Sequence, residues 1–125
     1  MKKMEIFSIP VLIALILLLA SCPSPAPVVD TLLAPGGLTA LAASSSSITL
    51  SWTDNSSSET GSKIERSPDG ASNWTWLTTT AANATSYDDW GLAASTPYYY
   101  RVCATNGTDD SGWSNTADAT TSGPE

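Results

Sequence analysis

The segment from Ser47 to Thr53 alternates strictly between apolar and hydroxyl side chains, and this period of two constrains the fold more than any other feature. Ile48, Leu50 and Trp52 fall on one side of an extended chain, and serine and threonine hydroxyls fall on the other. Successive side chains of a β-strand point to opposite faces, so a strand buried on one face needs this period. We therefore expect a half-buried strand whose apolar face carries an indole.

Strand signals recur along the chain. Residues 63–66 predict a strand, and Ser-Pro-Asp-Gly at 67–70 ends it, because proline presets one turn position and glycine tolerates a positive φ. Residues 74–80 are rich in threonine and tryptophan, which suit a pleated surface. Residues 98–104 alternate again, and 114–121 predict a last strand. Since no helical period follows residue 22, the pattern indicates an all-β sandwich or barrel.

The N-terminus predicts an export signal. Lys2 and Lys3 precede an apolar run from Val11 to Ala20, although Glu5 weakens the positive start. The run has about half of the ~20 residues that a membrane-spanning helix needs. A basic start, a short apolar stretch and small residues at its end are typical of a cleaved signal. The alternative is a buried core helix, but the run has no polar face.

The end of this run, Leu-Ala-Ser-Cys at 19–22, resembles the lipobox of bacterial lipoproteins. The resemblance implies that the thiol of Cys22 carries a diacylglycerol and that cleavage falls between Ser21 and Cys22. The alternative is an ordinary signal peptide cut nearby, with Cys22 incidental. Because the lipid accounts for Cys22, the second cysteine, Cys103, is left unpaired and we expect no disulfide. We expect Cys103 to pack rather than react.

We divide the chain into a signal peptide at 1–21, a tether at 22–33, one domain at 34–121 and a tail at 122–125. The tether alternates proline with small residues, which favours an extended, semi-rigid backbone. In lipoproteins of some enteric bacteria, an aspartate directly after the lipidated cysteine is linked to retention in the inner membrane. Pro23 follows Cys22 here, so the resemblance to lipoproteins implies the outer membrane or the cell surface instead of the inner membrane.

Charge limits the partners. After removal of residues 1–21, three basic and eleven acidic residues remain, a formal balance of −8. An acidic surface repels nucleic acid and anionic headgroups, so we expect no nucleic-acid partner. Membrane attachment must then come from acyl chains, each buried CH2 contributing about 0.8 kcal/mol. We expect a monomer.

The domain resembles fibronectin type III. Residues 35–40 look like the first strand of that family, 48–52 like its second, 61–67 like its third, and 91–92 with 96–102 like the stretch that leads into its sixth. The resemblance implies a seven-stranded, immunoglobulin-like Greek-key sandwich. The signal peptide, as a helix, and the tether would precede it.

The resemblance also assigns core positions. Trp52 is expected to pack between the sheets with six apolar partners: Ile48, Leu50, Ile64, Leu92, Tyr100 and Val102. Tyr98 is expected to act as the corner tyrosine, with its hydroxyl bonded to backbone near Leu92. Ser62 departs from the pattern, since the family places a large aromatic there. We expect Trp74 or Trp76 to fill that volume.

Catalytic chemistry has little support. The chain has no histidine, the commonest general base and metal ligand. The pairs Asp88-Asp89 and Asp109-Asp110 suggest a glycosidase dyad or a calcium site, but neighbours on a strand face opposite sides. We interpret both pairs as solvated acidic loops. We expect no enzyme, no cofactor and no bound metal.

The tryptophans are the candidate binding residues. Besides Trp52 there are four more, and they cannot all be buried in a small core. Trp74 and Trp76 are two apart and therefore share a face, where an exposed pair can stack sugar rings or anchor a protein. Trp113 precedes the last strand and is a second candidate. The alternative is that these side chains cover the sandwich or its rim.

Three functional hypotheses remain open. The first is a membrane-anchored, non-catalytic binding module for a protein or glycan ligand. The second is a spacer or display domain, or a remnant of a larger surface protein or carbohydrate-active enzyme. The third is a hydrolase, which would need a pocket joining Asp54, Asp88 or Asp109.

Overall fold

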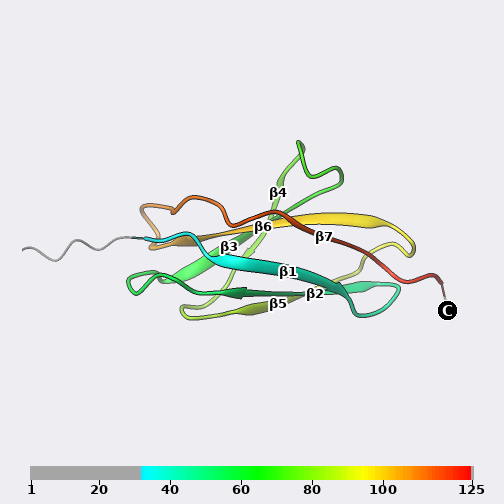
Figure 1. The fold of residues 1–125 in the computed structure, drawn as a ribbon, viewed down its shortest axis with the longest axis horizontal. Helices are drawn as coiled ribbons and strands as arrows, with labels where there is room; N and C mark the ends of the chain where they lie inside the picture. The colour runs from blue at the N-terminus through cyan, green and yellow to red at the C-terminus, as the bar shows by residue number, and fades with distance from the viewer. Residues whose placement is uncertain (1–31, 125) are drawn as a thin grey trace, which may run out of the picture.

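The computed structural model describes residues 32–124 as two antiparallel sheets packed face to face (Figure 1). The seven strands are β1 (Gly36–Ala42), β2 (Ser47–Thr53), β3 (Gly61–Ser67), β4 (Thr75–Thr79), β5 (Ser86–Trp90), β6 (Pro97–Thr105) and β7 (Ala117–Thr120). The expected seven-stranded all-β sandwich is confirmed. The expected signal helix, Ser21, Cys22 and most of the tether lie outside the described residues.

One sheet has three strands in the order β1-β2-β5, and the other has four in the order β4-β3-β6-β7. The alternating segment of the sequence forms β2, the central strand of the three-stranded sheet. Its pairing with β5 places Ser47 opposite Trp90 and Thr49 opposite Asp88. No helix that could span a membrane occurs within 32–124.

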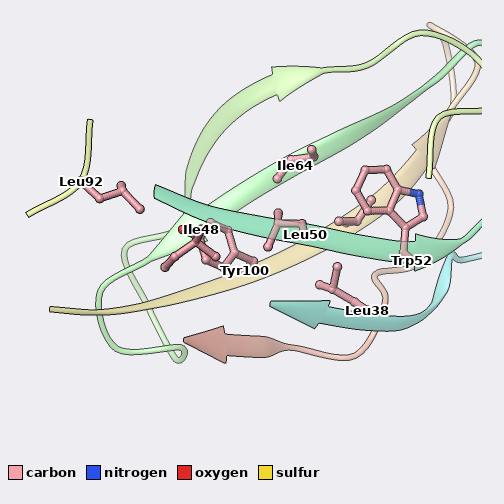
Figure 2. Close-up of a cluster of buried hydrophobic side chains, with 8 residues drawn as sticks. Leu38, Ile48, Leu50, Trp52, Ile64, Leu92 and Tyr100 are labelled. Carbon is pink, nitrogen blue, oxygen red and sulfur yellow. The ribbon is translucent and has the colours of Figure 1, made fainter. Parts of the chain in front are cut away.

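The core lies between the inner faces of the two sheets (Figure 2). Trp52 is 5% exposed, and Ile48, Leu50 and Ile64 are fully buried. The cluster comprises Leu38, Ile48, Leu50, Trp52, Ile64, Leu92, Tyr100 and Val102. The period of two therefore sorts side chains as expected, and Leu38 of β1 joins the six partners that the resemblance implied for Trp52.

Tyr98 closes the corner between β5 and β6. The backbone N–H of Ala93 donates a hydrogen bond to the Tyr98 hydroxyl at 2.9 Å. The ring is partly buried and packs against the core. The bond falls one residue beyond Leu92, next to the position that the family resemblance implies.

The acidic pair at 88–89 is not a solvated loop, and that interpretation is wrong. It lies within β5, where alternation turns Tyr87 and Asp89 inward and leaves Asp88 and Trp90 outside. Asp89 is 4% exposed. A cation between the sheets, Arg66, makes this burial tolerable, because buried carboxylates need a charged or hydrogen-bonding partner.

Two smaller expectations also differ. The last strand is only four residues long, because Ser114 bonds Val102 through both its backbone N–H and its hydroxyl before β7 begins. Neither Trp74 nor Trp76 fills the space beside the buried Ser62. Trp76 is 59% exposed on the outer face, whereas Leu77 packs against the core. A bulge shifts the β3–β4 register between Ile64 and Glu65, so that Trp76 pairs with Glu65 and lies on the outer face.

The two ends of the sandwich are distinct (Figure 1). At one end, both the N–H and the C=O of Leu33 bond the hydroxyl of Ser56, in the β2–β3 loop. At the other, Ser122 donates to Ser44 in the β1–β2 turn, and Leu92 donates to Ser46. The chain therefore enters the sandwich at one end and its C-terminal residues leave at the opposite end.

Candidate functional site

Arg101 lies between two indole rings on the outer face of the four-stranded sheet. Its guanidinium carbon is 4.3 Å from the ring centroid of Trp74 and 4.1 Å from that of Trp113. Alternation along β6 explains the position, because the inward side chains of Tyr100 and Val102 turn Arg101 outward. Both distances are within the ~6 Å range of cation–π attraction.

The Glu65 carboxylate accepts two hydrogen bonds from the edge of the Arg101 guanidinium. It faces Arg101 across the β3–β6 pairing, and its Oε1 accepts hydrogen bonds from Nε at 2.9 Å and Nη2 at 2.7 Å. The side chains of the pair are 25% and 21% exposed. Rings on both faces and a carboxylate on the edge hold Arg101 in one geometry, although its contribution to stability stays modest because the site is partly solvated.

Trp76 extends the arrangement along β4. It is the Cα partner of Glu65, so its side chain falls on the same outer face. Its Nε1 donates to Thr79 Oγ1 at 3.2 Å, and 59% of the residue is exposed. We call the outer surface formed by Trp74, Trp76, Arg101 and Trp113 the tryptophan face.

The structure thus brings the three candidate tryptophans to one face of the molecule. Trp113 is 38% exposed and Trp74 is half-buried, because each gives one ring face to Arg101. Trp76 keeps most of its surface free. Sequence reasoning did not include Arg101 or Glu65, although the outward phase of Arg101 along β6 was available as a signal.

The β6–β7 loop covers the outer face beside this site. Lys63 Nζ bonds Asp110 Oδ2 at 2.8 Å, which raises the pKa of Lys63 and lowers that of Asp110. Ser111 Oγ accepts the backbone N–H of Ala104. Under this loop Cys103 is a buried free thiol, and burial raises its pKa to about 11. Cys103 therefore packs, because a protonated thiol is a poor nucleophile.

A second arginine lies between the sheets. Asp89 Oδ2 accepts hydrogen bonds from Arg66 Nη1 at 2.7 Å and from the Tyr100 hydroxyl at 2.9 Å. Burial, reinforced by the Asp89 carboxylate, raises the pKa of Tyr100. Arg66 also lies 5.3 Å from the Tyr98 ring centroid. This network ties β3, β5 and β6 together, so its role is structural.

The acidic residues do not converge. Within the part of the chain that the structure describes, no group of three or more metal-ligating side chains could hold an ion. No pocket is present among residues 32–124 to join Asp54, Asp88 or Asp109. Asp54 accepts the Ser56 N–H, and Asp88 accepts the Thr49 hydroxyl. Asp54 and Asp88 thus accept hydrogen bonds from neighbouring residues of the fold and not from a shared site.

The sequence matches the family model of the fibronectin type III domain over residues 33–120, most of the chain. The chain belongs to the fibronectin type III family. The search of the curated proteins found no match.

Solved structures with this fibronectin type III fold include both single-domain and multidomain proteins. An Fn3-like protein from Clostridium thermocellum is 27% identical with a TM-score of 0.63, covering 75% of this chain and 97% of that one. A β-1,2-glucanase from Parabacteroides distasonis is 27% identical with a TM-score of 0.67, covering 82% of this chain and 14% of that one. Titin domains A168–A170 are 26% identical with a TM-score of 0.64, covering 74% and 33%. This chain thus spans a third or less of the glucanase and titin chains.

Proposed function

We propose that this chain is a cell-envelope lipoprotein, anchored through a lipid on Cys22, that displays a non-catalytic fibronectin type III module for binding a protein or glycan ligand. The anchor is supported by the Leu-Ala-Ser-Cys sequence directly after a short apolar run. A surface with a formal excess of acid needs acyl chains to stay at a membrane. The proposed location is the outer membrane or the cell surface.

The observation that carries the binding role is the exposure of Trp76 within the tryptophan face. An indole that is 59% exposed has a flat apolar surface with a polar N–H at its edge. Arg101 and its two flanking rings form a rigid neighbouring surface, which lowers the entropy cost of recognition. Aromatic side chains and arginine are also the residues enriched where binding energy concentrates.

The anchor is tested by fractionating cells that express the full chain. We expect wild type in the membrane fraction and Cys22→Ala in the soluble fraction. Cys103→Ala is the matched control, because it removes the other cysteine and should remain with the membrane. Membrane retention of Cys22→Ala would contradict a lipid anchor.

The binding role is tested with the full chain in nonionic detergent on a glycan array and on immobilised envelope proteins. Trp76→Ala should lower the bound signal at least tenfold for the ligand of this face. Asp118→Asn, an exposed change on β7, is the control and should bind like wild type. Equal binding by Trp76→Ala and wild type would show that the tryptophan face does not bind the ligand.

A spacer or display role is the second candidate. It is favoured by the glucanase and titin structures, in which the similar region is a minor part of a longer chain. Under this alternative neither Trp76 nor any other exposed residue affects binding. A neighbouring reading frame that encodes a further domain in continuity would favour it over the binding module.

A further inference from the structure

A second exposed surface lies on the opposite side of the sandwich, on the outer face of the three-stranded sheet. Leu41 of β1, Thr49 of β2 and Asp88 of β5 form one row across the strands. Trp90 follows two residues after Asp88 and therefore shares its face. Leu41 is 72% exposed and Trp90 is 68% exposed, the highest values among the large exposed apolar residues of the described chain.

The rest of this face carries small hydroxyl side chains. Thr39 and Ser51 form the next row with Ser86, and all three are exposed. Ser47, opposite Trp90, is buried and its hydroxyl is paired with that of Ser44. Leu41 and Trp90 stand on the two outer strands, two strand spacings across and two residues along the sheet, or about 12 Å apart. The described residues form no pocket of the kind that a small ligand requires, and Thr39, Thr49, Ser51 and Ser86 present hydroxyl groups on this face.

Asp88 is held ready to accept hydrogen bonds next to the indole. Thr49 Oγ1 donates to Asp88 Oδ1 at 2.8 Å, which orients the carboxylate along the face. Among the described residues Asp88 makes no ion pair, unlike Asp89, which is bound between the sheets. An oriented carboxylate beside an exposed aromatic ring matches a ligand with hydroxyl groups and C–H faces, which is the chemistry of a sugar.

The charge of the domain argues against an anionic ligand. Each lysine and arginine within residues 32–124 is ion-paired: Lys63 with Asp110, Arg66 with Asp89 and Arg101 with Glu65. Against these three cations stand nine carboxylate side chains in the same range. No free cation remains there to hold sulfate, phosphate or uronate groups, so an anionic polymer would be repelled.

The position of the face fits a partner that approaches from outside the membrane. Trp90 and Leu41 lie near the end that holds Ser44 and Leu92, opposite the end where Leu33 enters the sandwich. Residues 1–31, which include Cys22, precede Leu32 in the chain and are therefore joined to the domain at that opposite end. This orientation argument rests on the proposed lipid anchor, whereas the binding chemistry does not.

We propose that the outer face of the three-stranded sheet binds a neutral polysaccharide, with a sugar ring stacked on Trp90 and sugar hydroxyls donating to Asp88. Leu41 supports a neighbouring unit of the same polymer, diagonally across the sheet from Trp90. A linear polymer suits a flat, extended surface better than a protein does, because the face offers one charge and no cavity. The interaction is non-covalent, and each unit contributes modestly.

The test is affinity electrophoresis of the full chain, in nonionic detergent, through native gels containing laminarin, hydroxyethylcellulose, glucomannan or, as the anionic probe, alginate. Wild type should be retarded by at least one of the neutral polymers and not by alginate. Trp90→Ala should lose the retardation at least tenfold, and Asp88→Asn should lose it several-fold. Asp118→Asn, an exposed carboxylate change on β7 of the other sheet, is the matched control for Asp88→Asn and should be retarded like wild type. Trp76→Ala is run beside these variants to separate recognition at the tryptophan face from recognition at this one.

Retardation by none of the three neutral polymers, or equal retardation of Trp90→Ala and wild type, would overturn the inference. Loss in Trp76→Ala with retention in Trp90→Ala would also overturn it, but would support recognition at the tryptophan face. Unchanged melting temperatures for all four variants show that the fold is intact. Failure of the lipid anchor changes only the cell fraction from which the chain is purified, so the two proposals fail separately.

Discussion

Two arginines of this domain, one between the sheets and one outside them, are each bound to a carboxylate and to aromatic rings. Arg66, whose side chain is 29% exposed, binds Asp89, whose side chain is only 6% exposed, and the Tyr100 hydroxyl donates to the same carboxylate oxygen. Arg101 binds Glu65, and both side chains keep more than a fifth of their surface in water. The inner pair links strands β3 and β5 between the sheets, whereas the outer pair holds Arg101 against the rings of Trp74 and Trp113 on the surface.

The same pairing of arginine, carboxylate and aromatic rings thus has different consequences in the two places. Loss of Arg66 leaves the buried Asp89 carboxylate without its cation, and loss of Asp89 leaves the buried Tyr100 hydroxyl without an acceptor. Loss of one partner from the outer pair leaves a group that water can solvate, so the penalty is smaller. We therefore expect stability to depend on the interior and the proposed recognition to depend on the outer faces. Four predictions follow this division, from the largest effect to the smallest.

Replacement of Trp52 by alanine should cost about 3–5 kcal/mol of unfolding free energy, because it leaves a cavity between the sheets. Chemical denaturation monitored by far-UV circular dichroism measures the change. Trp76→Ala is the control and should cost no more than about 0.5 kcal/mol, since Trp76 is mostly exposed. Similar losses of unfolding free energy for the two variants would contradict the assignment of Trp52 to the core and Trp76 to the surface.

Replacement of Asp89 by alanine should cost about 2–3 kcal/mol, because it removes the acceptor of the buried Tyr100 hydroxyl and the partner of Arg66, which water partly solvates. Asp88→Ala removes the neighbouring carboxylate on the same strand and should cost under about 1 kcal/mol. Urea unfolding of the two variants side by side gives the comparison. An Asp89 variant as stable as the Asp88 variant would show that the inner network contributes nothing.

Replacement of Arg101 by alanine should cost about 1–2 kcal/mol through loss of the two ring contacts and the Glu65 pair. Arg101→Lys keeps the charge but cannot fill the planar space between two indoles, so most of the loss should remain. Tryptophan fluorescence should report greater solvent exposure in both variants. Full stability in Arg101→Lys would indicate that charge, not stacking, holds the face together.

The smallest expected effect at neutral pH is that of Cys103, which acts only on alkaline stability. Burial raises the pKa of Cys103 to about 11 from an ordinary value of 9.0, so the folded state retains the thiol proton more strongly than the unfolded state. The resulting stability is complete below about pH 9 and is lost as the pH rises through about 11. Cys103→Ala should flatten this part of the pH profile. The raised pKa of Tyr100 acts in the same direction and persists in that variant.

The sequence predicted the fold to the extent that local alternation determines it. The Ile48–Trp52 segment has one face buried and one face wet, so its period is visible without knowledge of its neighbours. β5 was missed because its inward positions hold Tyr87 and Asp89, and an aspartate is interpreted as buried only when its partner is known. That partner, Arg66, lies 23 residues earlier in the chain.

The candidate surfaces were predictable only in part. Tryptophan content indicated that some indoles must be exposed, but the chain alone could not tell which ones. The stack of Trp74, Arg101 and Trp113 joins segments from three parts of the sequence, and the exposure of Trp90 depends on the phase of a strand that was read as a loop. These side chains are placed by tertiary contacts, and such contacts leave no periodic pattern in a short stretch of sequence.

Intact-mass and peptide mass spectrometry of the mature N-terminus decide whether the module is anchored by a lipid on Cys22. We expect residues 1–21 to be absent and the first residue to be Cys22 bearing a diacylglyceryl thioether. A mature chain that begins elsewhere, or that begins at Cys22 with an unmodified thiol, would rule out the lipid anchor.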